Sequence, residues 1–207
     1  MSSLTVEHEI IVADGGSRDG TCDVAIGGGC TVISTSPGRG IQLAAGVRAA
    51  RGEWLLIIHA DARIAAAALA EAEMALTDRE ISCAVWQLEM MGEGRWMWIV
   101  ERVARWRSSA LGLPYGDQGL LIRRELYDAA GGFPELPIME DVALVRRVGR
   151  LAPIRHFTHA IRADSRRYQK EGAVRRVLLN VALLTLFLCG VPAAVLARRY
   201  LPHREPG

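Results

Sequence analysis

Short apolar runs alternate with amphipathic stretches over the first 80 residues of the chain. Apolar residues gather at 10–13, 31–33 and 55–58, and each run leads through glycine or polar residues into a segment with helical spacing. The run Leu55-Leu56-Ile57-Ile58 is apolar at every position, which is typical of a strand covered on both faces. This alternation predicts βαβ units, and therefore an α/β fold with a Rossmann-like, mostly parallel sheet flanked by helices.

The pattern changes beyond residue 80. Residues 82–91 have strand-like composition, residues 120–122 predict a buried strand, and residues 142–150 predict a helix. Residues 96–110 form an amphipathic helix that carries three tryptophans, with Glu101, Arg102, Arg105 and Arg107 opposite its apolar face. Packing against the core explains this helix more simply, and a position at a bilayer surface remains the alternative.

The last part of the chain predicts an apolar helical tail. Residues 177–197 contain no charge and are bracketed by arginine pairs, and Gly190-Val191-Pro192 interrupts them. We therefore expect two helices, one ending near Cys189 and a second starting at Pro192, that lie in or against a membrane interface or a partner. A single membrane-spanning helix and a buried soluble pair stay open. The predicted domains are residues 1–172 and a tail of residues 173–207.

Composition narrows the class of protein. The chain has 207 residues, of which 50% are hydrophobic and 23% charged, and its formal net charge is +2. These values argue against a disordered chain and against a nucleic-acid-binding groove. Four scattered cysteines and an N-terminus without a signal-peptide pattern indicate a reduced, cytoplasmic protein.

Polar residues follow two of the predicted strands. Asp14-Gly15-Gly16-Ser17 comes directly after the first, in the strand, glycine turn and helix order that brings backbone N–H groups close to a phosphate or ribose. His59 and Asp61 end the 55–58 strand, and ligands of open α/β sheets bind beyond such strand ends. A plain turn and a solvated Asp at the end of a core strand are the simpler alternatives.

Four further polar groups have a functional interpretation, and the first three also have a structural one. Arg39, between two glycines, could reach a phosphate or simply be solvated. Asp117 and Gln118, also between glycines, could bind a polyhydroxyl ligand or form a turn. Glu140-Asp141 could supply a general base or complement a helix dipole. The Arg166-Arg167-Tyr168 segment could clamp a diphosphate.

Taken in order, these motifs closely resemble those of the family 2 glycosyltransferases. The resemblance rests on Asp14-Gly-Gly-Ser-Arg-Asp-Gly-Thr21, His59-Ala-Asp61, Gly116-Asp-Gln-Gly119 and Gly131-Gly-Phe133 followed by Met139-Glu-Asp141. It extends from Glu9 through the apolar tail and is strongest for the small bacterial subgroup labelled arsenosugar-biosynthesis glycosyltransferases.

The resemblance implies a GT-A fold, a nucleotide-sugar donor, an acceptor hydroxyl and a divalent metal, Mn²⁺ or Mg²⁺. One base and an in-line acceptor would give inversion, and the leading hypothesis is an inverting transfer at the cytoplasmic face of a membrane. By matching position, Asp141 is the catalytic base and Glu140 supports it, while Asp117 and Gln118 line the acceptor side. The implied donor-binding residues are Asp14, Gly15, Ser17, Arg39, Asp61 and Arg167, and the implied metal ligands are Asp61 and His59.

The chain departs from the family pattern at three places. His59 stands where most members have Asp, and Ala44 stands where relatives often have Asn. The first strand and helix of the family, with their Pro and Asn-Glu pair, have no counterpart before Glu9. A misassigned or trimmed start, a gap filled by another chain, and impaired donor binding are the three explanations.

Two other functions compete with the glycosyltransferase. One is a truncated, non-catalytic protein with a binding or scaffolding role. The other is a nucleotidyltransferase, which the missing lysine near the glycine-rich loop disfavours. The sequence identifies neither the sugar, the base, the acceptor nor the oligomeric state.

Overall fold

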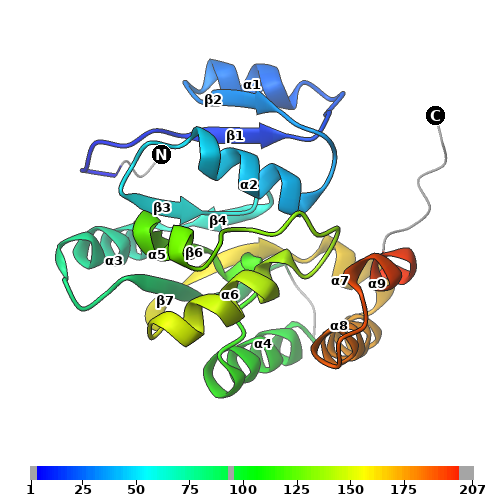
Figure 1. Cartoon of the computed structure of the whole chain (residues 1–207). Helices are drawn as coiled ribbons and strands as arrows, with labels where there is room; N and C mark the ends of the chain where they lie inside the picture. The colour runs from blue at the N-terminus through cyan, green and yellow to red at the C-terminus, as the bar shows by residue number, and fades with distance from the viewer. Residues whose placement is uncertain (1–3, 93–95, 201–207) are drawn as a thin grey trace.

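The computed structural model describes residues 4–92 and 96–200, which form an α/β fold (Figure 1). The strands are β1 (Ile11–Asp14), β2 (Thr31–Ser34), β3 (Trp54–Ile57), β4 (Ala62–Ile64), β5 (Cys83–Met91), β6 (Leu120–Arg123) and β7 (Arg155–Asp164). The helices are α1 (Thr21–Gly27), α2 (Arg39–Ala49), α3 (Ala66–Thr77), α4 (Met97–Leu111), the 3₁₀ turn η1 (Gly116–Gln118), α5 (Arg124–Ala129), α6 (Glu140–Leu151), α7 (Arg166–Glu171), α8 (Ala173–Leu188) and α9 (Ala193–Tyr200).

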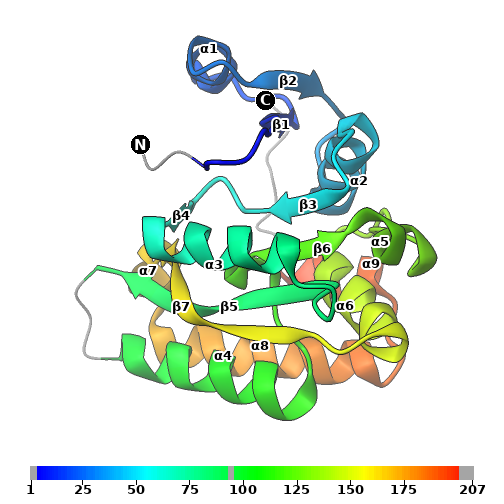
Figure 2. The same ribbon diagram turned by 90° about the vertical axis from the view of Figure 1, so that its left-hand side faces the viewer.

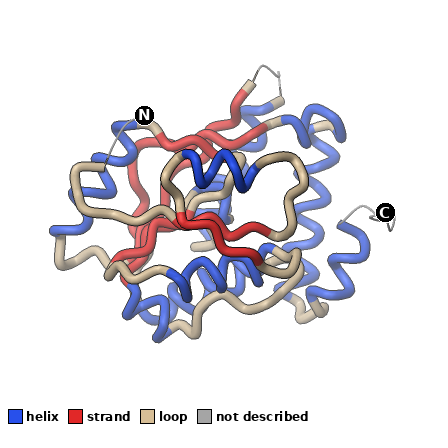
Figure 3. The backbone as a smooth tube through the Cα atoms, turned by 90° about the horizontal axis from the view of Figure 1, so that it is seen from above, coloured by secondary structure: helices blue, strands red, loops and turns tan. Residues whose placement is uncertain are grey.

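The strands form two sheets. β1 and β2 pair in parallel, and the other five follow the order β3-β6-β5-β7-β4. In the larger sheet β5 and β7 are parallel, whereas β6 runs antiparallel to β3 and β5. Seen from above, the small sheet and α1 lie over the rest of the fold (Figure 3). The predicted α/β class is confirmed, and the sheet is mixed.

The apolar core lies on both faces of the larger sheet, because alternate residues of its strands point to opposite sides. Val85 and Ile122 pack with α2, α5 and α6 on one face. Trp86 and Leu121 pack with the alanines of α3 and with β7 on the other. These central strands hold the polar residues at their ends in fixed positions.

Helix α4 packs against the core, as its apolar spacing predicted. Val100 and Ala104 are buried with β5 and with Ala173 of α8, and α4 and α8 lie side by side (Figure 2). Arg107, which the pattern placed on the polar face, is also buried. A hydrophobic pattern predicts that a charged residue faces solvent, whereas Arg107 has partners inside the fold.

The tail forms two helices, as predicted from Gly190-Val191-Pro192. α8 and α9 are separated by residues 189–192, so the single continuous helix of the alternative is absent from the described part of the chain. Leu183 and Leu196 are buried against the loop that precedes α6. Within residues 4–92 and 96–200, no helix combines the length and apolar character needed to cross a bilayer.

Candidate functional site

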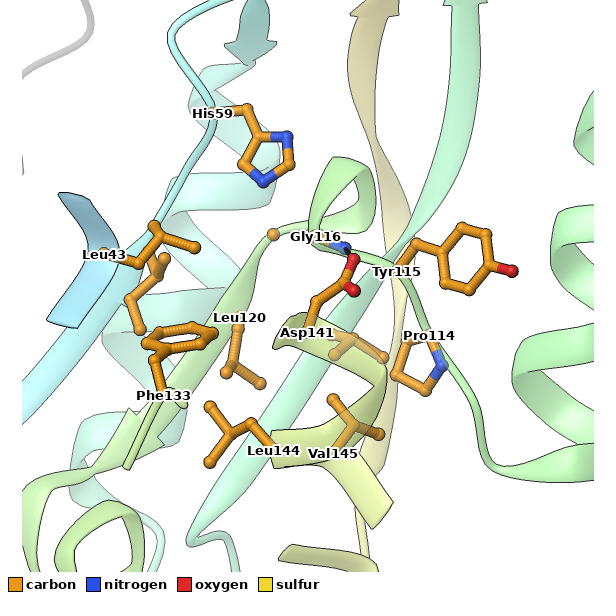
Figure 4. Close-up of a pocket in the computed structure, with 13 residues that line it drawn as sticks. Leu43, His59, Pro114, Tyr115, Gly116, Leu120, Phe133, Asp141, Leu144 and Val145 are labelled. Carbon is orange, nitrogen blue, oxygen red and sulfur yellow. Dashed lines mark hydrogen bonds between the residues drawn. The ribbon is translucent and has the colours of Figure 1, made fainter. Parts of the chain in front are cut away.

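Four segments that are distant in the sequence meet beyond the end of β3. They are His59 after β3, Arg39 at the start of α2, Gly116 in η1 and Asp141 at the start of α6. His59 and Asp141 line a cavity of about 20 Å³ together with Tyr115 and Gly116 (Figure 4). A cavity of this volume holds about one water molecule. The segments that the sequence singled out separately therefore form one polar cluster.

Two glycines permit this convergence. A Cβ atom on Gly40 would lie 2.4 Å from the carbonyl oxygen of Pro134 and 2.8 Å from that of Leu136, so the start of α2 touches the loop that leads into α6. A Cβ atom on Gly116 would lie 2.4 Å from Nε2 of His59, so the imidazole rests on the backbone of η1. Larger residues would push these segments apart.

The carboxylate of Asp141 is held by two backbone N–H groups. Gly116 donates to Oδ2 over 2.8 Å, and Val142 donates to Oδ1 over 2.8 Å. The guanidinium Nη2 of Arg39 lies 3.5 Å from Oδ2. Asp141 is buried at the start of α6, where the helix dipole favours a negative charge. The side chain is therefore fixed with its oxygen atoms toward the cavity (Figure 4).

Glu140 lies behind Asp141 and is 0% exposed. Nε of Arg39 forms an ion pair with Oε1 of Glu140 over 2.9 Å. The N–H group does not point at this oxygen, so neither carboxylate oxygen of Glu140 accepts a hydrogen bond from a described residue. Burial and the neighbouring charge of Asp141 raise the pKa of Glu140 to about 7. Its charge therefore changes close to neutral pH.

Met139, which caps α6, has φ of 64°, in the left-handed region. Among the residues that the structure describes, Met139 is the only one other than glycine with a positive φ. Such a conformation costs on the order of 1–3 kcal/mol for a residue with a side chain. The backbone strain lies directly before the two carboxylates.

His59 accepts a hydrogen bond from Nη2 of Arg39 over 3.2 Å. Burial and the positive charge of Arg39 lower the pKa of His59, which favours the neutral form of the imidazole. Asp61, two residues further on, is exposed. The described residues contain no group of three His, Cys, Asp or Glu side chains that could hold a metal ion.

This donor set suits one kind of metal site. Mg²⁺ and similar hard ions are commonly bound through one or two carboxylates, with phosphate oxygens and water supplying the other ligands. The exposed carboxylate of Asp61 fits that arrangement. Nε2 of His59 fits it less well, because its lone pair already accepts the hydrogen bond from Arg39.

Asp14 lies at the end of β1, in the smaller sheet. Its Oδ2 accepts hydrogen bonds from the backbone N–H groups of Gly16 over 2.9 Å and Ser17 over 3.0 Å. Hydrogen bonds from the side chain and backbone of Ser17 lower the pKa of Asp14. Gln42 of α2 donates to the carbonyl of Ala13, and its Cδ lies 3.0 Å from the position that a Cβ atom on Gly15 would take. The motif is therefore an ordered turn joined to α2.

The two predicted acceptor-side residues have different surroundings. Asp117 Oδ1 is buried without a hydrogen-bond partner among the described residues, and burial raises the pKa of this carboxyl group. Gln118 is buried, and its amide donates to the carbonyl of Trp86 and accepts from Arg107. Gln118 therefore has internal partners, whereas Asp117 is free to receive a donor.

Sequence reasoning missed Arg107. Its Nε donates to the carbonyl of Leu113 over 2.8 Å, and its guanidinium lies 3.2 Å from the centre of the Tyr115 ring. The charge of Arg107 opposes the rise in the pKa of Asp117. No local pattern identifies this arginine, because its partners come from η1 and the loop before it.

The predicted diphosphate clamp lies in α7. Arg166 pairs with Asp164, with 2.6 Å between Nε and Oδ2. The side chain of Arg167 lies outside the described part of the structure. Tyr168 accepts a hydrogen bond from Asn180 of α8 over 3.4 Å. Tyr168 lines the same cavity as Asp117.

The fold and the ordered motifs define a family. The sequence profile described as Glycosyl transferase family 2 matches residues 4–131, which is more than half of the chain. The chain therefore belongs to glycosyl transferase family 2. No curated protein sequence matches the chain. The narrower arsenosugar subgroup and the missing first strand and helix stay predictions.

Solved glycosyltransferases have a similar fold. A mannosyltransferase from Pyrobaculum calidifontis, in complex with GDP-Man and Mn²⁺, is 22% identical with a TM-score of 0.55 over 75% of this chain and 47% of that one. Glucosyl-3-phosphoglycerate synthase from Mycobacterium tuberculosis, in complex with Mn²⁺ and UDP, is 23% identical with a TM-score of 0.59 over 89% and 70%. S. aureus TarS, in complex with UDP-GlcNAc, is 17% identical with a TM-score of 0.57 over 76% and 50%.

These likenesses show the GT-A type of fold. The chain spans about half the length of the mannosyltransferase and of TarS. The nucleotide sugars and metal ions in those complexes are ligands of those proteins. That this chain binds similar ligands is a proposal.

Proposed function

We propose that this chain transfers a sugar from a nucleotide-diphosphate donor to an acceptor hydroxyl, with inversion at the anomeric carbon. The observation that carries the proposal is the position of Asp141. Its carboxylate faces a cavity and is fixed by the N–H of Gly116 and by Arg39. A fixed carboxylate at a cavity suits a general base, which must remove the proton of an attacking hydroxyl.

Arg39 and Glu140 support that base. Arg39 contacts both carboxylates and His59, so it fixes their relative positions. Glu140 is buried behind the cavity and does not reach a substrate. A single base that acts directly on the acceptor gives inversion, because retention requires a second carboxylate as nucleophile.

The donor lies on the side of β1 and β3 in this proposal. The turn of Asp14, Gly15 and Ser17 contributes the Asp14 carboxylate, which the backbone N–H groups of Gly16 and Ser17 hold in place beside the base or ribose. Asp61 holds a divalent cation, Mn²⁺ or Mg²⁺, with His59 as a second, weaker ligand. Such an ion, when bound, neutralises the charge of the departing diphosphate. Arg167 meets the same diphosphate, and Asp117 and Gln118 lie on the acceptor side.

The Mn²⁺-containing complexes of the mannosyltransferase and the glucosyl-phosphoglycerate synthase support the metal. They do not distinguish Mn²⁺ from Mg²⁺. The cytoplasmic location and peripheral contact of the tail with a membrane stay predictions from the sequence, and so does the non-catalytic alternative.

Release of nucleoside diphosphate tests the proposal. We expect purified protein with Mn²⁺ to release UDP or GDP from at least one sugar donor in a panel of UDP- and GDP-sugars. Calorimetry with UDP and GDP, with and without Mn²⁺, measures binding separately from turnover.

Three results are informative. Metal-dependent nucleotide binding with turnover supports the transferase. Binding without turnover for any donor, also with simple sugars and alkyl glycosides as acceptors, would favour the non-catalytic protein. Failure to bind either nucleotide in the presence of Mn²⁺ would contradict both the activity and the donor site.

A further inference from the structure

A second cavity, of about 180 Å³, lies between α4 and α8. Figure 2 shows these two helices side by side. Apolar side chains form its walls, including Val100, Ala104 and Trp106 of α4 and Val177, Val181 and Leu184 of α8. A cavity of about 150 Å³ accepts a benzene molecule, so this one has room for a ring or a short alkyl chain. We refer to it as the α4/α8 groove.

The α4/α8 groove is open at one end and polar at the other. Trp106 and Val181 line its outer part and are 60% and 46% exposed. Its inner part is lined by the polar side chains of Arg107, Tyr115, Asp117, Tyr168 and Asn180. An apolar passage that leads from solvent to buried polar groups matches a ligand with an apolar body and a polar head.

The inner end has an unused hydrogen-bond acceptor. Asp117 Oδ1 is buried and no described residue donates to it. Arg107 lies beside it but is occupied by Leu113, Gln118 and the ring of Tyr115. Buried polar atoms are rarely left without a partner, so a donor such as a hydroxyl group is the chemistry that this position lacks.

The inner end also adjoins the proposed base. Asp117 directly follows Gly116, whose N–H donates to Asp141 over 2.8 Å. Tyr115 lines both the α4/α8 groove and the small cavity at Asp141. A molecule that enters between α4 and α8 therefore brings its polar end to the place where an acceptor hydroxyl is needed.

We infer that the α4/α8 groove binds the acceptor, and that this acceptor is an amphiphilic alcohol whose hydroxyl-bearing head reaches Asp117 while its alkyl or aryl part lies between α4 and α8. The inference rests on the proposed transferase function. An α-helix is about 10 Å across with its side chains, which is too wide for a cavity of this volume. The buried polar end also distinguishes the groove from a surface that binds another protein or a lipid bilayer.

Binding of two glycosides to the full chain tests this inference. Octyl β-D-glucoside, kept below its micelle concentration, and methyl β-D-glucoside carry the same sugar and differ in the alkyl group. We expect calorimetry to show that the octyl compound binds with one-to-one stoichiometry and at least about tenfold more tightly. Equal affinities for the two compounds would overturn the inference.

Two substitutions on the exposed side of α8 form a matched pair. Val181 lines the groove, whereas Leu178 is 64% exposed and does not. Val181→Asp should lower the affinity for octyl β-D-glucoside at least about fivefold, because a charge would border the alkyl chain. Leu178→Asp should leave it unchanged. If Val181→Asp unfolds, Val181→Trp, which narrows the groove, replaces it.

Other outcomes would also overturn the inference. One is that Val181→Asp abolishes self-association or binding to phospholipid vesicles while octyl glucoside affinity is unchanged. Measuring nucleotide binding on the same preparations separates the acceptor inference from the proposed transferase function. Nucleotide binding without preference for the octyl compound would remove the apolar acceptor and leave the transferase. Octyl glucoside binding without any nucleotide binding would remove the acceptor assignment together with the transferase.

Discussion

The two sides of the candidate site are built differently. Around Asp14, the carboxylate is satisfied by N–H groups two and three residues away, and α1, which follows, buries none of its side chains. Around Asp141, contacts join α2, η1 and α6, and two neighbouring carboxylates, Glu140 and Asp141, are buried. Local turn chemistry orders the first side, while tertiary packing holds charges in place on the second. Substitutions should therefore cost more on the Asp141 side.

The largest effect is expected for Asp141→Asn. The amide has nearly the same shape and cannot accept the proton of the acceptor, so the transfer rate should fall by about 10²- to 10⁴-fold. Nucleotide affinity should stay within about twofold of the wild-type value. Steady-state kinetics and calorimetry measure the two quantities. Asp128→Asn, at an exposed position of α5, is the control, and unaltered turnover of Asp141→Asn would exclude it as the base.

Glu140→Gln should change how stability depends on pH. The pKa of Glu140 rises from 4.5 to about 7 in the folded chain, so between these values the folded state binds more protons than the unfolded state. The free energy of unfolding of the wild type should therefore decrease as the pH rises from about 5 to 8.

Gln at position 140 cannot ionise, so the variant should lack that decrease. At pH 8 it should be more stable than the wild type by on the order of 3 kcal/mol, with little difference at pH 5. Urea denaturation at the two pH values measures this. The exposed Glu125→Gln is the control. Parallel pH profiles for Glu140→Gln and the wild type would contradict the raised pKa.

Substitutions at two glycines of α2 test how closely this helix must approach the loop before α6. A Cβ atom on Gly40 would collide with the backbone at Pro134 and Leu136, whereas one on Gly46 would lie 3.7 Å from Ala13. Gly40→Ala should lower the free energy of unfolding by about 1–3 kcal/mol and reduce turnover, because Arg39 moves with the helix. Gly46→Ala should be neutral or stabilising by up to about 1 kcal/mol. Equal stabilities for the two variants would contradict the close approach.

The smallest effect is expected on the donor side, for Asp61→Ala. Affinity for UDP or GDP in the presence of Mn²⁺ should fall by at least about tenfold. Removing a residue that only supports a metal ligand already costs about this much, and Asp61 is proposed to bind the ion directly. Without Mn²⁺ the two proteins should bind equally. Calorimetry gives both values, and the exposed Asp78→Ala is the control. A wild-type affinity that does not respond to Mn²⁺ would exclude the metal site.

The same comparison explains what the sequence could predict. The α/β class, the turn at Asp14 and the helix starting at Glu140 follow from local patterns. The meeting of His59, Gly116 and Asp141 could be expected from the family resemblance. The pairing of Arg39 with Glu140 could not be predicted from the spacing, because it depends on how α2 packs against the loop before α6.

Elements with weak patterns were also missed. β7 covers Arg155–Asp164, where polar residues interrupt the apolar ones and only some positions are buried. Its register comes from pairing with β5 and β4 rather than from its own sequence. Arg107 was placed on the polar face of α4, although the carbonyl of Leu113 and the ring of Tyr115 bury it. Such partners become visible only when distant segments are brought together.

Met139 connects the tail to the chemistry of the site. Its side chain packs with Leu184 and Phe187 of α8 and with α9, while its left-handed backbone sets the direction in which α6 begins. Packing against the two tail helices therefore keeps Met139 in this left-handed conformation. A chain cut after Gly172 would lose that packing, and the first turn of α6 would be free to change its direction. The direction of the Asp141 side chain therefore depends on packing by two helices that lie far from it in the sequence.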